Sequence, residues 1–241
     1  MSYFLHLLPA LLGIALAMGY SYRAGKLTGA GVGTGGGVAL LIFLGTGYLG
    51  LALLTLFFGL GTGATAWRAA DKRLLGLAEE NRGRRTAGQV LANAGVAALL
   101  GLLCWQLPAF APLGRLMLAG SFAAATADTL SSELGNVYGT RYVNILTLRP
   151  GRRGDNGVVS VEGTLLGLAG SAVVAAAYGL ALGWGPWLWW LVVAGTAGNL
   201  ADSVLGATLE RRGLLSNNWV NTLNTLTGAG TAALGLSHGT W

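Results

Sequence analysis

The strongest constraint on the fold is a series of apolar stretches, each about as long as one membrane-spanning helix. A transmembrane helix needs about 20 mostly apolar residues, and the chain of 241 residues contains eight such stretches. Because only Gly45, Thr46 and Gly47 separate the second stretch from the third, a count of seven stays open. The sequence predicts an all-α polytopic membrane helical bundle of seven or eight transmembrane helices, forming a single domain over residues 1–241. The eight stretches are residues 3–21, 28–46, 48–66, 87–107, 113–134, 162–183, 187–208 and 219–238.

The composition excludes a soluble globular domain. Charged residues make up only 10% of the chain and hydrophobic residues 53%, whereas soluble domains average about 25% charged residues. Glycine supplies 41 residues, an enrichment typical of closely packed membrane helices. The single cysteine, Cys104, excludes an internal disulfide and a paired-cysteine metal or redox site. Helix packing alone must therefore hold the fold together.

The basic residues follow alternate apolar stretches. Of the 15 lysines and arginines, 14 lie after the first, third, fifth or seventh stretch, and only Arg115 lies elsewhere. Lysine and arginine concentrate in short cytoplasmic loops, so we expect cytoplasmic loops at 67–86 and 139–161 and both termini outside. We expect an integral protein of the cytoplasmic membrane of a prokaryote. This placement explains the net charge of +6 without a nucleic-acid partner.

Several of the nine acidic residues lie at the predicted cytoplasmic ends of the spans. Asp128 and Glu133 close the fifth stretch, Glu162 opens the sixth, and Asp202 lies near the end of the seventh. A carboxylate within a membrane span costs several kcal/mol and by default marks function. Helical spacing predicts one polar site on this side of the membrane, although some of its amides are equally compatible with helix packing alone. Its supporting amide and hydroxyl side chains are those of Asn93, Ser132, Asn199, Ser203 and Asn221.

The pair Asp128 and Asp202 indicates a bound cation. Two aspartates at the same membrane depth repel each other unless a cation or a basic group lies between them. Mg²⁺ is the candidate, because it binds through one or two carboxylates together with phosphate oxygens. The glycine-rich segment 146–163 adds three arginines whose guanidinium groups suit phosphate, Arg149, Arg152 and Arg153. A Walker-type phosphate loop is absent from the sequence.

Five ordered motifs carry a resemblance to a known family. They are KRLLGLAEENRGRRTAGQVLANAG (72–95), ATADTLSSELG (125–135), LRPGRRGDNGVVSVEGTLLGLAGS (148–171), LADSVLGATLE (200–210) and NNWVNTLNTLTGA (217–229). Together they resemble the integral membrane family called domain of unknown function 92, which includes transmembrane protein 19 and the plant phytyl-phosphate kinase. The segment ADTLSSELGNVYG (127–139) is also similar to the aspartate motif of CTP-dependent dolichol and phytol kinases.

The resemblance implies a membrane-bound isoprenoid phosphate kinase. Such an enzyme transfers a phosphoryl group from a nucleoside triphosphate, CTP or a similar nucleotide, to a phytyl or prenyl monophosphate lipid, with Mg²⁺ as cofactor. The implied catalytic residues are Asp128, Glu133 and Asp202, and the implied metal ligands are Asp128, Glu162 and Asp202. The implied nucleotide- and phosphate-binding residues are Lys26, Lys72, Arg85, Ser132, Arg149, Arg152, Arg153, Asp155 and Asn156.

Other functions remain open on the sequence alone. A prenol kinase would need a base to remove the hydroxyl proton, a role that falls to Asp128. A cytidylyltransferase that makes a CDP-lipid would use the same lipid phosphate, nucleotide and magnesium. A transporter or lipid flippase would also pair intramembrane aspartates, although the charges lie near one face of the predicted bundle.

Overall fold

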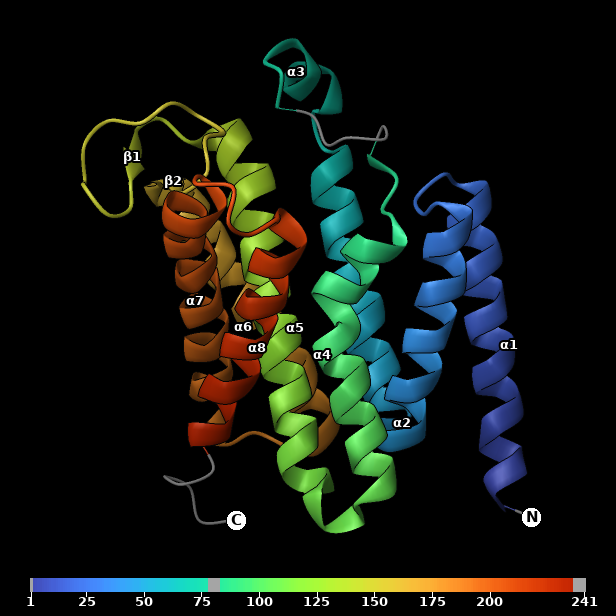
Figure 1. Ribbon diagram of the computed structural model, residues 1–241. Helices are drawn as coiled ribbons and strands as arrows, with labels where there is room; N and C mark the ends of the chain where they lie inside the picture. Colours follow the sequence, from blue (N-terminus) through green and yellow to red (C-terminus); the bar gives the residue numbers. More distant parts are fainter. Residues whose placement is uncertain (1, 78–82, 236–241) are drawn as a thin grey trace.

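The protein is a bundle of long helices that run side by side (Figure 1). The computed structural model describes residues 2–77 and 83–235, so residues 236–238 of the last predicted span and part of the predicted loop 67–86 lie outside the described chain. The long helices are α1 (Ser2–Arg23), α2 (Gly29–Ala66), α4 (Ala87–Gln106), α5 (Ala111–Tyr138), α6 (Val161–Leu182), α7 (Trp187–Leu205) and α8 (Asn217–Leu234). The connections contain α3 (Ala69–Leu74), the 3-10 turn Pro108–Phe110, strands β1 (Tyr142–Asn144) and β2 (Val158–Ser160), and the π-helical turn Gly206–Glu210.

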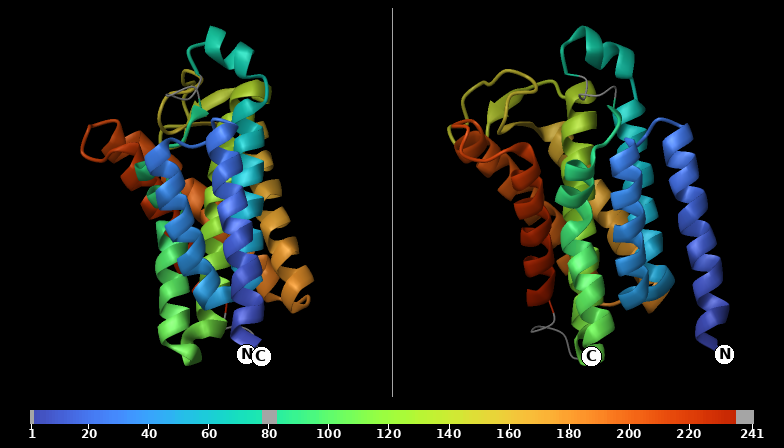
Figure 2. Two further views of the ribbon diagram at one scale, coloured as in Figure 1. Left: turned by 90° about the vertical axis from the view of Figure 1, so that its right-hand side faces the viewer. Right: turned by 45° about the vertical axis from the view of Figure 1, so that its right-hand side comes forward.

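Helix α2 is a hairpin of two antiparallel halves rather than one straight rod (Figures 1 and 2). Its backbone breaks at Gly47, where φ is 63° and ψ is −148°, a conformation that glycine adopts without steric cost. Gly31 and Gly61 both lie against Arg85, yet in a straight helix they would stand about 45 Å apart. The two predicted stretches 28–46 and 48–66 are therefore separate helical halves.

The predicted all-α membrane bundle is confirmed. By length and composition, four helices within the described residues could cross a membrane. Helix α5, with Asp128 and Glu133, and helix α8, with several asparagines, are not among these four. The count of eight spans stays a prediction. The four helices are Gly29–Ala66, Ala87–Gln106, Val161–Leu182 and Trp187–Glu210.

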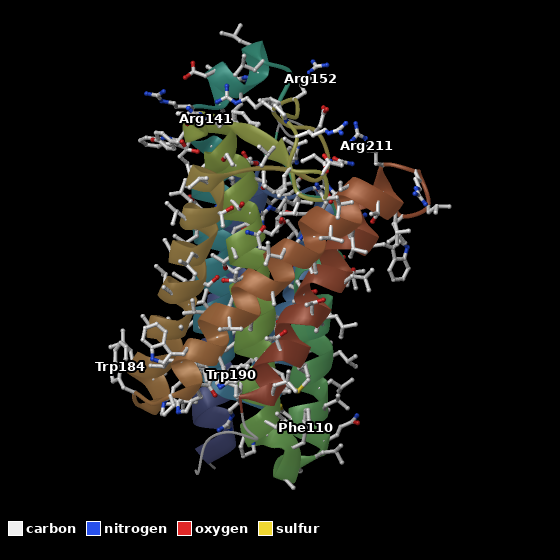
Figure 3. The ribbon with its side chains drawn as sticks, turned by 90° about the vertical axis from the view of Figure 1, so that its left-hand side faces the viewer. Phe110, Arg141, Arg152, Trp184, Trp190 and Arg211 are labelled. Atoms are coloured by element: carbon white, nitrogen blue, oxygen red, sulfur yellow. The ribbon has the colours of Figure 1, made fainter. Side chains whose placement is uncertain are left out.

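The two ends of the bundle differ in chemistry. Figure 3 shows Arg141, Arg152 and Arg211 at one end, and Phe110, Trp184 and Trp190 toward the other. The first end, which we call the basic end, carries α3 and the connection that contains the antiparallel pair β1–β2 (Figure 1). Helix α1 begins and helix α8 finishes at the opposite end (Figure 2). This separation agrees with the charge pattern of the sequence, while the side of the membrane to which each end belongs stays a prediction.

Hydroxyl caps start three helices at the basic end. Thr28 accepts a hydrogen bond from the backbone N–H of Gly31 at 3.1 Å, and Ser160 accepts one from Gly163 at 3.1 Å. Thr86 begins α4 with a reciprocal capping box, in which the side chain of Gln89 accepts from the Thr86 N–H at 2.8 Å. These caps satisfy backbone donors that the first helical turn leaves unpaired.

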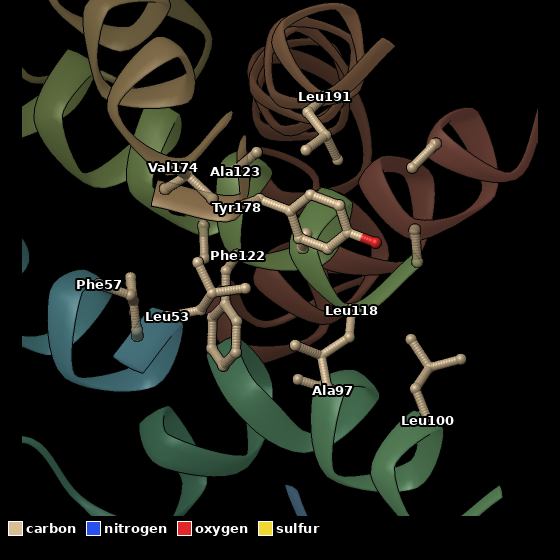
Figure 4. Packing of buried hydrophobic residues seen from close by; sticks show 14 of the residues in the cluster. Leu53, Phe57, Ala97, Leu100, Leu118, Phe122, Ala123, Val174, Tyr178 and Leu191 are labelled. Atoms are coloured by element: carbon tan, nitrogen blue, oxygen red, sulfur yellow. The ribbon is translucent and has the colours of Figure 1, made fainter. Parts of the chain in front are cut away.

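Helix α5 is the central helix and packs against α2, α4, α6, α7 and α8. Its middle is lined with fully buried small residues, and Phe122 stacks on Phe57 with ring centroids 5.8 Å apart (Figure 4). A Cβ on Gly120 of α5 would lie 2.6 Å from the carbonyl oxygen of Gly228 in α8. Glycine and alanine thus let the neighbouring backbones approach α5 closely.

Candidate active site

A polar cavity of about 250 Å³ lies at the basic end, among α4, α5, α7, α8 and the β1–β2 connection. We call it the acidic cavity, because five carboxylates and one guanidinium belong to its lining: Asp128, Glu133, Asp155, Asp202, Glu210 and Arg85. The lining also includes all of the amides and hydroxyls predicted from the sequence: Asn93, Ser132, Asn156, Asn199, Ser203 and Asn221. Residues from distant parts of the chain therefore meet in one site.

Asp128 of α5 and Asp202 of α7 lie next to each other in the acidic cavity, with their carboxyl groups in hydrogen-bond contact. Glu210 is close enough to interact electrostatically with both. Neither aspartate forms an ion pair with any described residue. When both carboxyl groups are ionised they repel each other unless a cation lies between them, so the pair favours a bound cation.

Glycines bring α5, α6 and α7 close enough for this meeting. A Cβ on Gly167 of α6 would lie 2.9 Å from the carbonyl oxygen of Ala127 and 2.9 Å from Nδ2 of Asn199. A Cβ on Gly135 of α5 would lie 2.9 Å from Cα of Gly163 in α6. All three distances are shorter than ordinary van der Waals contacts, so larger side chains at these positions would push the three helices apart.

Several polar groups of the cavity donate to their own helix. The hydroxyl of Ser132 donates to the carbonyl oxygen of Asp128 at 2.9 Å, and that of Ser203 donates to Asn199 at 3.1 Å. The amide of Asn93 donates to the carbonyl oxygen of Gln89 at 3.0 Å. Because the hydroxyl hydrogens of Ser132 and Ser203 are used in this way, these two side chains offer oxygen lone pairs to a ligand, and Asn93 offers its side-chain oxygen. Oxygen acceptors suit a hydrated cation better than they suit a bare phosphate.

Glu210 belongs to the site, although it is not among the site residues predicted from the sequence. It ends the π-helical turn Gly206–Glu210, and its carboxyl group is hydrogen-bonded to the side chain of Asn156. A Cβ on Gly157, whose φ is +74°, would lie 2.3 Å from Cβ of Ala207. The β1–β2 connection is therefore packed directly on the π-helical turn. That turn changes the phase of the helix, which a search for a 3.6-residue period does not reveal.

Glu133 and Lys72, predicted as a catalytic and a phosphate-binding residue, pair with each other. The ammonium group of Lys72 donates to a carboxylate oxygen of Glu133 and to the carbonyl oxygens of Ala64 at 3.0 Å and Thr65 at 2.9 Å. The hydroxyl of Thr65 donates to the other oxygen of Glu133 at 3.0 Å. With three acceptors for its three hydrogens, Lys72 is saturated by the protein itself.

Six predicted site residues do not line the acidic cavity: Lys26, Lys72, Arg149, Arg152, Arg153 and Glu162. Arg149 and Arg152 are exposed. Arg153 donates to the carbonyl oxygen of Val137 at 3.3 Å and lies over the ring of Tyr142, 5.4 Å from its centroid. Glu162 accepts a hydrogen bond from Thr140 at 2.6 Å at the surface. The structure therefore does not bring Glu162 together with Asp128 and Asp202.

A second pocket of about 400 Å³ adjoins the first and has the opposite charge. We call it the basic pocket, because four of its lining residues are basic and none of the described ones is acidic: Lys26, Lys72, Arg73 and Arg85. It lies between the α1–α2 turn, the end of α2, α3 and the segment before α4. Arg85 lines both pockets, so the two share a wall.

The acidic cavity fits a magnesium ion that is shared with a phosphate ligand. No group of three or more histidine, cysteine or acidic side chains within the described chain is arranged to hold a metal alone. Magnesium keeps several waters and needs only one or two carboxylates when phosphate oxygens complete its shell. The adjacent carboxyl groups of Asp128 and Asp202, neither of which forms an ion pair with a described residue, meet that requirement.

Comparison with known proteins gives consistent matches over most of the chain. The profile described as integral membrane protein DUF92 matches residues 12–229. An uncharacterized membrane protein of Synechocystis sp., sll0875, is 36% identical over 215 residues, which cover 86% of this chain and 81% of the relative. An uncharacterized membrane protein of Methanocaldococcus jannaschii, MJ0933, is 34% identical over 192 residues, covering 80% and 77%.

A plant protein is similar to the same extent. Protein VTE6, chloroplastic, of Arabidopsis thaliana is 34% identical over 212 residues, which cover 82% of this chain and 63% of the plant protein. This chain therefore spans a little under two thirds of that relative. No solved structure matches the chain.

Proposed function

The chain belongs to the DUF92 family of integral membrane proteins, as its motifs predict, and on that premise we propose that it is a phosphotransferase acting on an isoprenoid lipid. The reaction is transfer of the terminal phosphoryl group of a nucleoside triphosphate, CTP or a similar nucleotide, to a prenyl or phytyl monophosphate. The products are the lipid diphosphate and a nucleoside diphosphate. The resemblance to the phytyl-phosphate kinase of this family supports the reaction type. The similarity to the plant relative VTE6 extends over 82% of this chain.

The observation that carries the proposal is the pairing of an acidic cavity with a basic pocket across one wall. Phosphoryl transfer between two phosphates must bring two highly charged anions together, and it proceeds by positioning and charge neutralisation. Asp128 and Asp202 supply a site for the magnesium that accompanies a nucleoside triphosphate. Arg85, which lines both pockets, supplies positive charge between the two reactants.

In this mechanism the residues of the chain bind, orient and neutralise. Asp128 and Asp202 would hold Mg²⁺, which when bound withdraws charge from phosphate oxygens. Arg85 neutralises negative charge that develops on the transferring group. The monophosphate is largely dianionic at neutral pH, so one of its oxygens attacks the terminal phosphorus without a protein base. The bond from that phosphorus to the bridging oxygen breaks, and the electron pair leaves with the nucleoside diphosphate.

The product formed from a prenyl phosphate tests the proposal. Detergent-purified protein is incubated with geranylgeranyl phosphate, Mg²⁺ and each of the four nucleoside triphosphates in turn, and the lipids are identified by mass spectrometry. We expect the lipid diphosphate with at least one nucleotide. A CDP-lipid with release of pyrophosphate would instead establish a cytidylyltransferase. Geranylgeranyl monophosphate formed when geranylgeraniol replaces the lipid phosphate would establish a prenol kinase.

A further inference from the structure

We propose that the basic pocket binds the phosphate dianion of the acceptor lipid, while the acidic cavity takes the nucleotide with its metal. The inference rests on the proposed function and adds to it a separate site for each substrate. It follows from three observations on the pocket: its charge, its place at the edge of the bundle, and the wall that separates it from the acidic cavity.

Two of the basic groups of the pocket have no ion-pair partner among the described residues. Lys26 and Arg73 line it and form no ion pair with any described residue. Lys26 is partly buried in the turn between α1 and α2, and Arg73 is exposed on α3. Two basic groups that converge on one pocket from separate elements suit the oxygens of one phosphate group. The acidic cavity, by contrast, repels a phosphate that arrives without a metal.

The wall between the pockets keeps the charges apart. Glu133 lines the acidic cavity, and its ion-pair partner Lys72 lines the basic pocket. Thr65 lines the basic pocket and donates to Glu133 at 3.0 Å. The carboxylate therefore belongs to the acidic side and the ammonium group to the basic side. Arg85 lines both pockets, so it would lie between two phosphate groups that are bound one in each pocket.

The place of the pocket favours a lipid as the source of the phosphate. Helix α1 packs mainly on α2 and stands at the edge of the bundle (Figure 2). Three aromatic side chains within one helical turn of pocket residues are exposed to solvent or lipid. They are Tyr20, Tyr22 and Trp67, which are 67%, 57% and 51% exposed. Exposed tyrosine and tryptophan side chains at the ends of membrane helices mark the level of the lipid headgroups. A phosphate carried by a membrane lipid reaches the pocket at this level.

A binding experiment without turnover tests the assignment. The double variant Lys26→Gln/Arg73→Gln is compared with Arg23→Gln, a control that removes a nearby charge at the last residue of α1, outside both pockets. Calorimetric titrations of the purified full chain use geranylgeranyl phosphate, geranylgeraniol and inorganic phosphate, and a separate titration uses CTP with Mg²⁺. We expect the double variant to bind geranylgeranyl phosphate at least about tenfold more weakly, because hydrogen bonds to charged groups are lost. Binding of geranylgeraniol and of CTP should be unchanged.

Each other outcome overturns the inference. Equal affinities of the double variant and the Arg23→Gln control for geranylgeranyl phosphate would remove the pocket as an anion site. Weaker binding of CTP in place of the lipid phosphate would make the pocket a nucleotide site. An equal loss for inorganic phosphate, with no preference for the lipid, would rule out a lipid source. Since no nucleotide is turned over, failure to form the diphosphate would count against the proposed function and would not alter these binding results.

Discussion

The buried ammonium group of Lys72 joins three parts of the chain. Lys72 lies on α3 and forms an ion pair with Glu133 on α5. It also donates to two carbonyl oxygens in the last turn of α2. The side chains of Lys72 and Glu133 are only 3% and 12% exposed. Loss of one member of such a buried pair leaves the other charge uncompensated. Lys72 therefore holds α3, and with it one side of the basic pocket, against the bundle.

We predict that Lys72→Met lowers the free energy of unfolding by about 3–5 kcal/mol, as removal of one partner of a buried ion pair does. The double variant Lys72→Met/Glu133→Gln should lose less than the sum of the two single variants, because no charge is then left unpaired. Thermal or denaturant unfolding in detergent measures both. Arg68→Gln serves as control, since its exposed pair with Asp71 contributes at most about 1 kcal/mol. Additive losses in the double variant would argue against a coupled pair.

At the level of the helices, the apolar stretches predict every long helix of the bundle. The predicted break between 28–46 and 48–66 coincides with the turn at Gly47. This break was predictable because glycine residues interrupt the apolar stretch there. The meeting of Asp128 with Asp202 was predictable from their places near the ends of two spans. Two features depend on contacts between distant segments. They are the π-helical turn that carries Glu210 and the exposure of Arg149 and Arg152 away from the acidic cavity. No local pattern encodes such contacts.

Gly167 of α6 offers a test at this scale. Gly167→Ala would place a methyl group 2.9 Å from both Ala127 and Asn199, and overpacking of this kind costs about 1–3 kcal/mol. We expect a lower unfolding midpoint and a fall in phosphoryl transfer, since α6 separates from the helices that carry the two aspartates.

The matched control is Gly37→Ala, at a helical glycine where an added Cβ meets nothing within 4 Å. Alanine favours the helix over glycine by about 1 kcal/mol, so this variant should be neutral or more stable. Identical behaviour of the two alanine variants would show that the close approach at Gly167 does not position the site.

For the whole molecule, the two pockets and the loop arginines share one end of the bundle, and the exposed tryptophan Trp184 lies toward the other (Figure 3). Positive loops face the cytoplasm in membrane proteins, which would put both pockets where nucleotides are available. A lipid phosphate could then approach from the membrane surface while the nucleotide enters from solution. The central claim is that the terminal phosphoryl group passes from nucleotide to lipid at Asp128 and Asp202.

The most direct measurement follows a label on the terminal phosphate of the nucleotide into the lipid fraction. Purified wild-type protein, Asp128→Asn and Asp71→Asn are each given the labelled nucleotide, Mg²⁺ and geranylgeranyl phosphate. Asp71 lies on α3 outside both pockets, so its variant controls for the loss of one carboxylate. We predict label in the lipid diphosphate for wild type and Asp71→Asn, and at least about tenfold less for Asp128→Asn, a loss of about 1.4 kcal/mol or more in the barrier. Label that never enters the lipid, or equal transfer by the two variants, would contradict the account.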